Sequence, residues 1–101
     1  MSSLLPIYFT SRAKRDIKKI KKKNKVLYNK INDSIIELSK NVYYGSMKTG
    51  DLKGVYSIDI YDSGINYELA YRIEFTEKDE MVLILMFGTR ENFYKELKRY
   101  L

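Results

Sequence analysis

The amino-acid sequence predicts a single α+β domain over residues 1–101, in which an N-terminal strand, a helical hairpin and a C-terminal helix pack on a mostly antiparallel sheet. Three patterns predict this class. Apolar residues recur every three or four positions between residues 13 and 38, alternate with polar residues between 55 and 75, and run almost unbroken from 81 to 87. The expected order of elements is therefore β-αα-βββ-α. A chain of this length normally supports one hydrophobic core.

The N-terminal half predicts one strand and two helices. A short strand is expected at Ile7–Phe9, beside the single proline, and Thr10 or Ser11 can cap the helix that follows. The apolar face of this helix consists of Ala13, Ile17 and Ile20. Residues 21–25 lack any apolar side chain, so we expect a turn there. The second helix should end near Asn41, and its apolar face consists of Leu27, Ile31, Ile35 and Leu38, with Ile36 alongside.

The C-terminal half predicts three strands and a helix. Alternation in residues 55–61 and 67–75 gives each strand one apolar face and one face with polar residues. The second face comprises Ser57, Asp59, Tyr61, Glu68, Ala70, Arg72 and Glu74. Residues 62–64 predict a turn and residues 76–80 a second connection. Residues 81–87 read as a central strand covered on both faces, which should stop at Gly88. Thr89 can then cap a helix over residues 91–101, with Phe93, Leu97 and Leu101 on one face.

The composition excludes several classes of function. The chain has no Cys and no His, so disulfides, thiolate nucleophiles, zinc clusters and His-dependent hydrolases are ruled out. We expect no metal and no small-molecule cofactor. Acid–base chemistry would have to use Glu, Asp, Lys or Tyr, with Arg to stabilise negative charge. No apolar run reaches the roughly 18 residues of a membrane span, and no signal peptide is visible, so a soluble protein of the reducing cytoplasm is expected.

The net charge of +6 is concentrated in one segment. Residues 12–25 hold nine basic residues and one acid, Asp16, and so carry +8, whereas the rest of the chain carries −2. Such a stripe favours contact with nucleic acid, but a solvated face or a dock for an acidic protein fits equally well. The candidate nucleic-acid-binding residues are Lys18, Lys19, Lys21, Lys22 and Lys23, together with Lys48 and Lys53.

Two further groups can carry chemistry. Arg90 lies where the last helix is expected to begin, and free backbone N–H groups beside an Arg suit a phosphate; alternatively, Arg90 pairs with Glu91 or Glu68. Glu68 and Arg72 share the polar face of one strand, where they can serve as a base and a charge clamp. They can equally form a solvated cross-strand ion pair.

The order of these motifs resembles the RelE/ParE toxin superfamily. The similarity rests on residues 52–60, the Ser63-Gly64 turn, residues 67–73 and the corner at residues 88–91. Upstream, the helical hairpin matches at Phe9, Ala13, Lys18, Ile20, Ile31, Leu38, Asn41 and Gly45. The resemblance covers nearly the whole chain, and it is specific through the joint order and spacing rather than through any single motif.

This resemblance implies the toxin of a bacterial toxin–antitoxin pair, with a cognate antitoxin as its partner. It also implies that Arg90 is the phosphate-stabilising arginine and that Tyr94 lies near the tyrosine of the last helix, about one residue closer than usual. Three positions depart from the family's pattern. Ser57 and Asp59 replace two strand lysines, and Glu68 replaces a strand arginine, although some relatives use a glutamate as the base.

Two functions of different classes follow. The first is a metal-independent endoribonuclease that cuts mRNA on the ribosome. Its catalytic residues would be Glu68 as general base, Arg72 and Arg90 as phosphate clamps, and Tyr94 as proton donor or stacking group. The second is a ParE-like, non-enzymatic inhibitor of DNA gyrase. The retained pair of Arg90 and Tyr94 favours the first.

Overall fold

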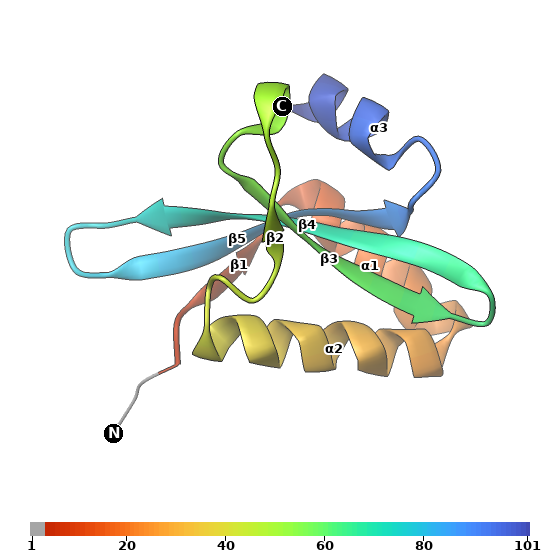
Figure 1. Ribbon diagram of the computed structural model, residues 1–101. Helices are drawn as coiled ribbons and strands as arrows, with labels where there is room; N and C mark the ends of the chain where they lie inside the picture. Colours follow the sequence, from red (N-terminus) through yellow and green to blue (C-terminus); the bar gives the residue numbers. More distant parts are fainter. Residues whose placement is uncertain (1–3) are drawn as a thin grey trace.

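The computed structural model describes residues 4–101 as a five-stranded sheet with helices on both faces (Figure 1). The strand order is β1-β5-β4-β3-β2; β1 runs parallel to β5, and the other neighbours are antiparallel. The elements in chain order are β1 (Ile7–Phe9), α1 (Ser11–Lys23), α2 (Lys25–Lys40), β2 (Ser46–Met47), the 3₁₀ helix η1 (Gly50–Leu52), β3 (Val55–Asp62), β4 (Ile65–Phe75), β5 (Glu80–Thr89) and α3 (Phe93–Tyr100). The predicted fold class is confirmed.

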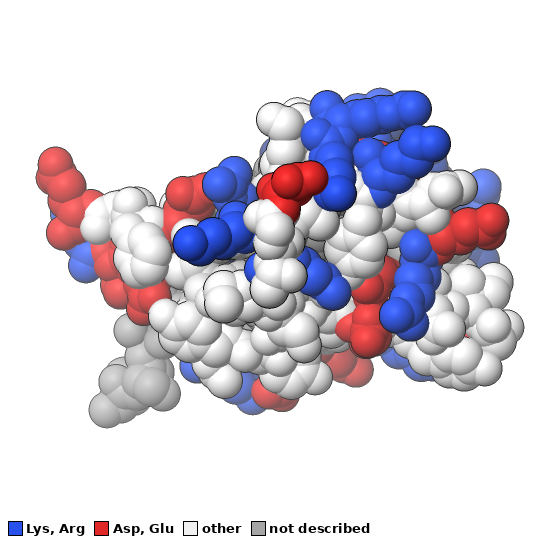
Figure 2. Space-filling model, turned by 45° about the horizontal axis from the view of Figure 1, so that its top comes forward, with Lys and Arg blue, Asp and Glu red and all other residues white. Residues whose placement is uncertain are grey.

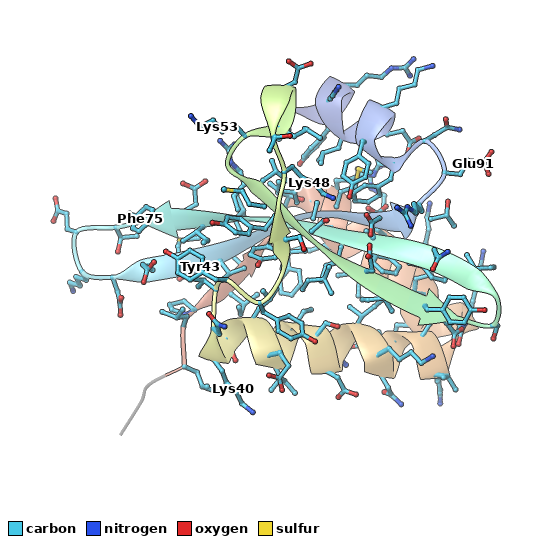
Figure 3. The ribbon with its side chains drawn as sticks, in the orientation of Figure 1. Lys40, Tyr43, Lys48, Lys53, Phe75 and Glu91 are labelled. Carbon is cyan, nitrogen blue, oxygen red and sulfur yellow. The ribbon has the colours of Figure 1, made fainter. Side chains whose placement is uncertain are left out.

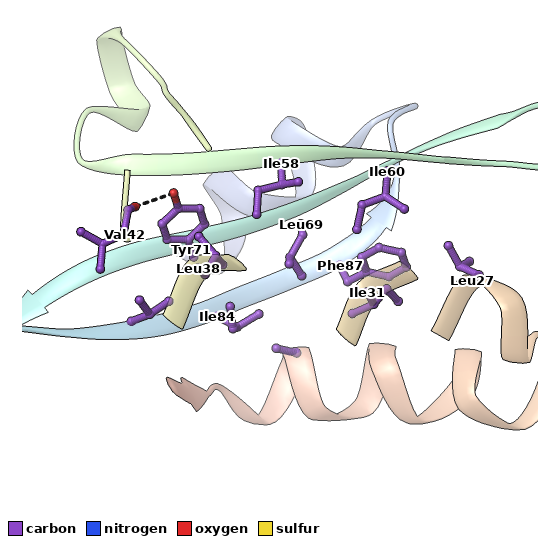
Figure 4. Packing of buried hydrophobic residues seen from close by; sticks show 12 residues of the cluster. Leu27, Ile31, Leu38, Val42, Ile58, Ile60, Leu69, Tyr71, Ile84 and Phe87 are labelled. Carbon is purple, nitrogen blue, oxygen red and sulfur yellow. Dashed lines mark hydrogen bonds between the residues drawn. The ribbon is translucent and has the colours of Figure 1, made fainter. Parts of the chain in front are cut away.

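The sheet separates two buried clusters. The larger lies between the α1–α2 hairpin and the sheet, as Figure 4 shows from close by, and includes Leu27, Ile31, Leu69, Tyr71 and Phe87. The smaller lies on the opposite face, under α3 and η1, and includes Leu52, Val55, Ala70, Leu85, Met86, Phe93 and Leu97. β5 contributes to both clusters and is covered on both faces, as the apolar run at residues 81–87 predicts, and β4 also contributes to both.

Several local predictions are confirmed. Thr10 is the N-cap of α1, and its hydroxyl accepts the N–H of Ala13 at 3.0 Å. α2 ends with Asn41 as its C-cap. On β3 the alternation holds, because Ile58 and Ile60 enter the cluster under the helical hairpin while Asp59 and Tyr61 are exposed.

The turn expected at residues 21–25 is present but shorter than predicted, because both helices extend into this segment. α1 continues through Lys23, α2 begins at Lys25, and Asn24 alone separates them. Asn24 caps both helices: its N–H donates to the carbonyl of Ile20, and its side chain accepts the N–H of Leu27. The terminal lysines need no apolar partner, since they point to solvent at a helix C-terminus where positive charge is favourable.

The end of β5 and the start of the last helix also differ from prediction. Gly88 and Thr89 continue the strand and pair with Glu68 and Tyr67, so Gly88 does not stop it and Thr89 is not a cap. The helix begins at Phe93, after Asn92 in a left-handed conformation with φ 61°. Arg90 therefore lies in the turn before the helix and not at its first position. Leu101 is 53% exposed, so it does not continue the apolar face.

Two elements, β2 and η1, were not predicted from the sequence. Met47 pairs with Tyr56 and Ser46 with Ser57, so β2 forms an edge strand against β3. A two-residue strand of exposed side chains has no hydrophobic period to reveal it. None of the helices in residues 4–101 has the length and apolarity that a bilayer crossing requires.

Candidate active site

A polar cluster lies on the α3 side of the sheet, where β3, β4 and the last helix meet. Alternation along the strands turns Ser57 and Glu68 to this side. α3 presents Phe93 to the apolar cluster and places the next residue, Tyr94, over the polar strand positions. The tyrosine hydroxyl bonds to both Ser57 and Glu68, so three elements converge on one oxygen atom.

Glu68 is an acid buried in an unusual way. It is 1% exposed, and the hydroxyl of Tyr94 hydrogen-bonds to its Oε1. Its other oxygen, Oε2, is buried without any partner among the described residues. A buried polar atom left unpaired destabilises a fold by about 1–3 kcal/mol, and more when it is charged. Such an atom requires a physical explanation.

The surroundings of Glu68 favour its protonated form. Burial, together with the Asp59 carboxyl, raises the pKa of Glu68 to about 7, although the hydrogen bond from Tyr94 acts in the opposite direction. Asp59 acts from directly across the ladder, since it pairs with Glu68 between β3 and β4. A carboxyl with a pKa near neutrality is suited to exchange protons under physiological conditions.

Tyr94 is fixed by three contacts. Its oxygen lies 3.1 Å from Oγ of Ser57, and the Nζ of Lys48 lies 4.8 Å from the centre of its ring. The hydroxyl carries one proton, so it donates to Glu68 when that acid is ionised and accepts from the Ser57 hydroxyl. Burial and the neighbouring Glu68 raise the pKa of Tyr94, so this residue stays neutral when Glu68 is ionised.

An open hollow of about 310 Å³ adjoins this cluster. It is lined by Tyr44, Gly45, Ser46, Lys48, Ser57, Ile58 and Asp59. In Figure 3, Lys48 lies between β2 and α3, whereas Lys53 lies further out, near η1. Lys48 therefore brings a cation to the side of β3 where Ser57 and Asp59 supply none. The chain has no His or Cys, and residues 4–101 contain no group of three acids placed to hold a metal ion.

The structure separates the two candidate arginines from each other. Arg72 is four residues from Glu68 on β4, roughly 13 Å along the strand, and is exposed. Arg90 lies two residues beyond Gly88, the partner of Glu68, and lines a second hollow of about 440 Å³ with residues of the β3–β4 turn. Glu91 points outward from the same connection (Figure 3). Within residues 4–101 neither arginine forms an ion pair.

The lysine-rich hairpin lies on the opposite face of the sheet from Glu68 and Tyr94. Lys18, Lys19, Lys21, Lys22 and Lys23 are all exposed. A groove of about 620 Å³ runs beside α1, with Phe9, Ile17 and Tyr28 as its apolar lining and Lys14, Lys18, Lys21 and Lys22 around them. We name these seven residues the hairpin groove. The predicted nucleic-acid-binding set is therefore split, because only Lys48 and Lys53 lie on the side of the polar cluster.

Sequence reasoning missed part of the positive charge near the site. Lys95, Lys98 and Arg99 are exposed on α3, and Figure 2 shows basic side chains gathered over this helix. The signal was present, since three basic residues in the last helix fall off its apolar face. Ser57 was also missed as a contact, because the sequence alone cannot show that Tyr94 reaches it.

Comparison with known proteins gives one family and one fold. A family model described as the ParE-like toxin of type II bacterial toxin–antitoxin systems matches residues 7–98. A comparison with curated proteins gives no match.

Solved toxin structures are similar in fold to this chain. They include a YoeB/ParE toxin from Agrobacterium tumefaciens, with 17% identity and a TM-score of 0.73 over 85% of this chain and 99% of that one. A chain of the intact RelBE toxin–antitoxin complex of E. coli has 18% identity and a TM-score of 0.65, covering 83% and 94%. The YoeB dimer from Staphylococcus aureus has 22% identity and a TM-score of 0.65, also covering 83% and 94%.

Proposed function

This chain belongs to the ParE-like toxin family of type II bacterial toxin–antitoxin systems, and we propose that it is an endoribonuclease that cuts mRNA on the ribosome. The observation that carries the proposal is the pair formed by Glu68 and Tyr94. A buried carboxyl with a pKa of about 7 is bonded to a tyrosine hydroxyl beside an open, polar hollow. A protein that acted only by binding gyrase would have no use for a proton-exchanging group of this kind.

The burial of Glu68 assigns different tasks to the two residues. Because Glu68 is 1% exposed, a substrate hydroxyl cannot reach its oxygens directly, whereas the Tyr94 ring is only partly buried. Tyr94 therefore relays the proton. The 2′-hydroxyl of the RNA gives its proton to the Tyr94 oxygen while Tyr94 passes its own proton to Oε1 of Glu68. Glu68 is the base, and Tyr94 connects it to the substrate.

The chemical step then balances without an added reactant. The freed 2′-oxygen attacks the adjacent phosphorus, a 2′,3′-cyclic phosphate forms, and the bond to the 5′-oxygen breaks. The departing 5′-oxygen takes a proton from solvent in the open hollow. Glu68, now protonated, returns its proton to solvent through the Tyr94 hydroxyl, and the site is restored.

Cations beside the hollow would stabilise the charge that develops on the phosphate. Lys48 lines the hollow and lies against Tyr94, so its ammonium group is the nearest candidate. Arg90 begins roughly 7 Å along the strand from Gly88, within reach of an extended guanidinium group. We therefore assign phosphate binding to Lys48 and Arg90. Arg72, roughly 13 Å from Glu68, is assigned to the RNA backbone further along.

Two observations favour the alternative, a ParE-like inhibitor of DNA gyrase. The family model that matches is the ParE-like one. Ser57 and Asp59 also stand at the two strand positions where the resemblance to RelE-like nucleases leads us to expect lysines. Under this alternative, the basic residues of α3 would meet gyrase or DNA, and Glu68 would have no chemical task.

An induction experiment decides between the two. The toxin, its Glu68→Gln variant and a Glu74→Gln control are induced separately, followed by primer extension on several transcripts and by a reporter of DNA damage. Glu74 is the matched control because it lies on the same strand but is only half-buried. We expect transcript cleavage with the wild type and the control and none with Glu68→Gln. DNA damage signalling with intact transcripts, unaffected by Glu68→Gln, would refute the nuclease.

The antitoxin implied by family membership is proposed to cover the hairpin groove. Apolar residues line the groove and four lysines surround it, which suits an amphipathic segment with acidic residues along its edges. Replacing Lys18, Lys21 and Lys22 with Gln should weaken antitoxin binding and make it less dependent on salt. Unchanged affinity in a pull-down with the neighbouring small protein would place the antitoxin elsewhere.

A further inference from the structure

Two consecutive tyrosines on the loop between α2 and β2 are exposed. Tyr43 is 60% exposed and Tyr44 is 49% exposed. They differ in what they adjoin. Tyr44 lines the hollow next to Lys48 and Ser57, whereas Tyr43 packs edge-on against Tyr56 at a centroid distance of 6.1 Å. Figure 3 shows Tyr43 and Lys48 on different sides of β2. Only Tyr44 therefore belongs to the hollow.

This loop is held rigidly by a buried tyrosine. The hydroxyl of Tyr71 donates to the carbonyl of Val42 at 2.7 Å (Figure 4) and accepts the N–H of Gly45 at 2.9 Å. The Tyr71 ring is fully buried and stacks on Tyr56 at 5.3 Å. A Cβ at Gly45 would come within 2.7 Å of the Ser57 carbonyl oxygen, so the loop presses directly onto β3. Tyr71 thus fixes the backbone on both sides of Tyr43 and Tyr44.

The hydrogen bonds of Asn41 complete the arrangement. Its side-chain oxygen accepts the N–H of Tyr43 at 3.0 Å, and its carbonyl accepts the N–H of Tyr44 at 3.1 Å. The loop backbone is therefore tied at four successive residues, yet the ring of Tyr44 fills no core. Because the backbone is already fixed, binding to this half-exposed ring orders only the side chain and not the loop.

We propose that Tyr44 is a stacking platform for a nucleobase of single-stranded RNA beside the bond to be cut. This inference rests on the proposed nuclease function and names a substrate subsite for it. Bases unstacked from a single strand pack on exposed aromatic rings, whereas bases in a duplex cannot. Lys48 lies in the same hollow, so a base on Tyr44 would bring its phosphate toward that cation.

The composition of the hollow favours a nucleotide over an apolar protein segment. Apart from Tyr44 and Ile58, its lining side chains are two serines, a lysine and an aspartate. These groups offer hydrogen bonds and one positive charge, which match a base edge, a ribose and a phosphate. The hollow also adjoins Ser57, whose hydroxyl lies 3.1 Å from the Tyr94 oxygen that we assign to the proton relay.

Binding of a labelled RNA tests the platform. The probe is a single-stranded hexaribonucleotide with one 2-aminopurine base, and every variant carries Glu68→Gln so that the probe stays intact. Tyr44→Leu should weaken binding about 5- to 150-fold, the range expected for losing one base–aromatic stack. It should also abolish the fluorescence quenching that stacking causes. Tyr44→Phe should keep both, and Tyr43→Leu, the matched control, should bind like its parent.

The outcomes separate this inference from the function on which it rests. In the Glu68-intact background, transcript cleavage in induced cells serves as the measure of function. Cleavage by the wild type together with equal RNA binding by Tyr44→Leu and its parent would overturn the platform alone. Loss of binding in Tyr44→Phe as well would overturn stacking in favour of a hydroxyl contact. A wild type that neither cleaves transcripts nor binds the probe would overturn both proposals.

Discussion

Replacing Glu68 with Gln should change how stability depends on pH, and the size of the change follows from the structure. Folding raises the pKa of this carboxyl from 4.5 to about 7 because the fold buries it against Asp59. The native state therefore holds the proton more tightly than the unfolded state between these two values. Stability must fall as pH rises through this window, since the unfolded state gives up its proton first.

Each pH unit within the window is worth at most 1.36 kcal/mol. From 4.5 to about 7 the loss comes to roughly 3 kcal/mol, an order-of-magnitude figure. For a domain of about 100 residues this corresponds to roughly 10–20 °C in melting temperature. The chain has no His, so no imidazole contributes to the pH dependence of stability in this window.

The assay is urea unfolding of the wild type, Glu68→Gln and Asp59→Asn at several pH values between 5 and 8. The wild type should lose stability across this range, whereas Glu68→Gln should show almost no slope. Asp59→Asn should show a smaller slope than the wild type, because one cause of the raised pKa is gone. The slope is the test, since Gln adds its own constant effect. A Glu68→Gln protein with the wild-type slope would refute the assignment.

Three further predictions concern other contacts. Asp62→Asn should lower the melting temperature at neutral pH, because Asn24 and Lys30 hold the pKa of Asp62 below its usual value. This stabilisation is present above the usual pKa and is lost as pH falls through the lowered pKa. The two proteins should therefore melt alike in strong acid, and a difference that persists there would contradict the prediction. Tyr71→Phe should cost about 1–3 kcal/mol in urea unfolding, because it leaves the Val42 carbonyl and the Gly45 N–H unpaired; an unchanged midpoint would show that the loop is held otherwise. Arg90→Ala should change stability by less than about 0.5 kcal/mol, since the residue is exposed, yet reduce cleavage on the order of 10²–10³; full activity in a destabilised protein would remove Arg90 from the site.

The hydrophobic pattern was sufficient to predict the fold but not the element ends. Periods of 3.6 and 2 are repeated over many residues, so they survive local exceptions, and the order of elements followed from them. Ends depend on single contacts. Gly88 looks like a stop signal, but the strand continues because its backbone pairs with Glu68, and the end of β5 is set by pairing with β4 rather than by the residue itself.

For the candidate site, the sequence could predict only which side of the sheet each strand residue faces. Alternation places Ser57, Asp59 and Glu68 on one side of the sheet, and this much can be inferred from spacing alone. The contact between Glu68 and Tyr94 could not be, because it depends on the angle at which α3 leaves β5. The chain turns between them at Asn92, a left-handed residue that the hydrophobic pattern does not reveal.

The three departures from the superfamily pattern bear on the pKa of one carboxyl group, that of Glu68. Lysines at positions 57 and 59 would hold a nearby carboxylate in its ionised form and lower its pKa. In this chain Ser57 is neutral, and Asp59 lies directly across from Glu68 and raises its pKa. The cation instead comes from Lys48, whose positive charge lowers the pKa of Glu68 less than burial and Asp59 raise it. With Ser57 and Asp59 in place of two lysines, β3 carries two fewer positive charges here, and the pKa of the buried Glu68 carboxyl lies near neutrality. In the proposed nuclease mechanism, which has no His to draw on, Glu68 is the group that would exchange the proton.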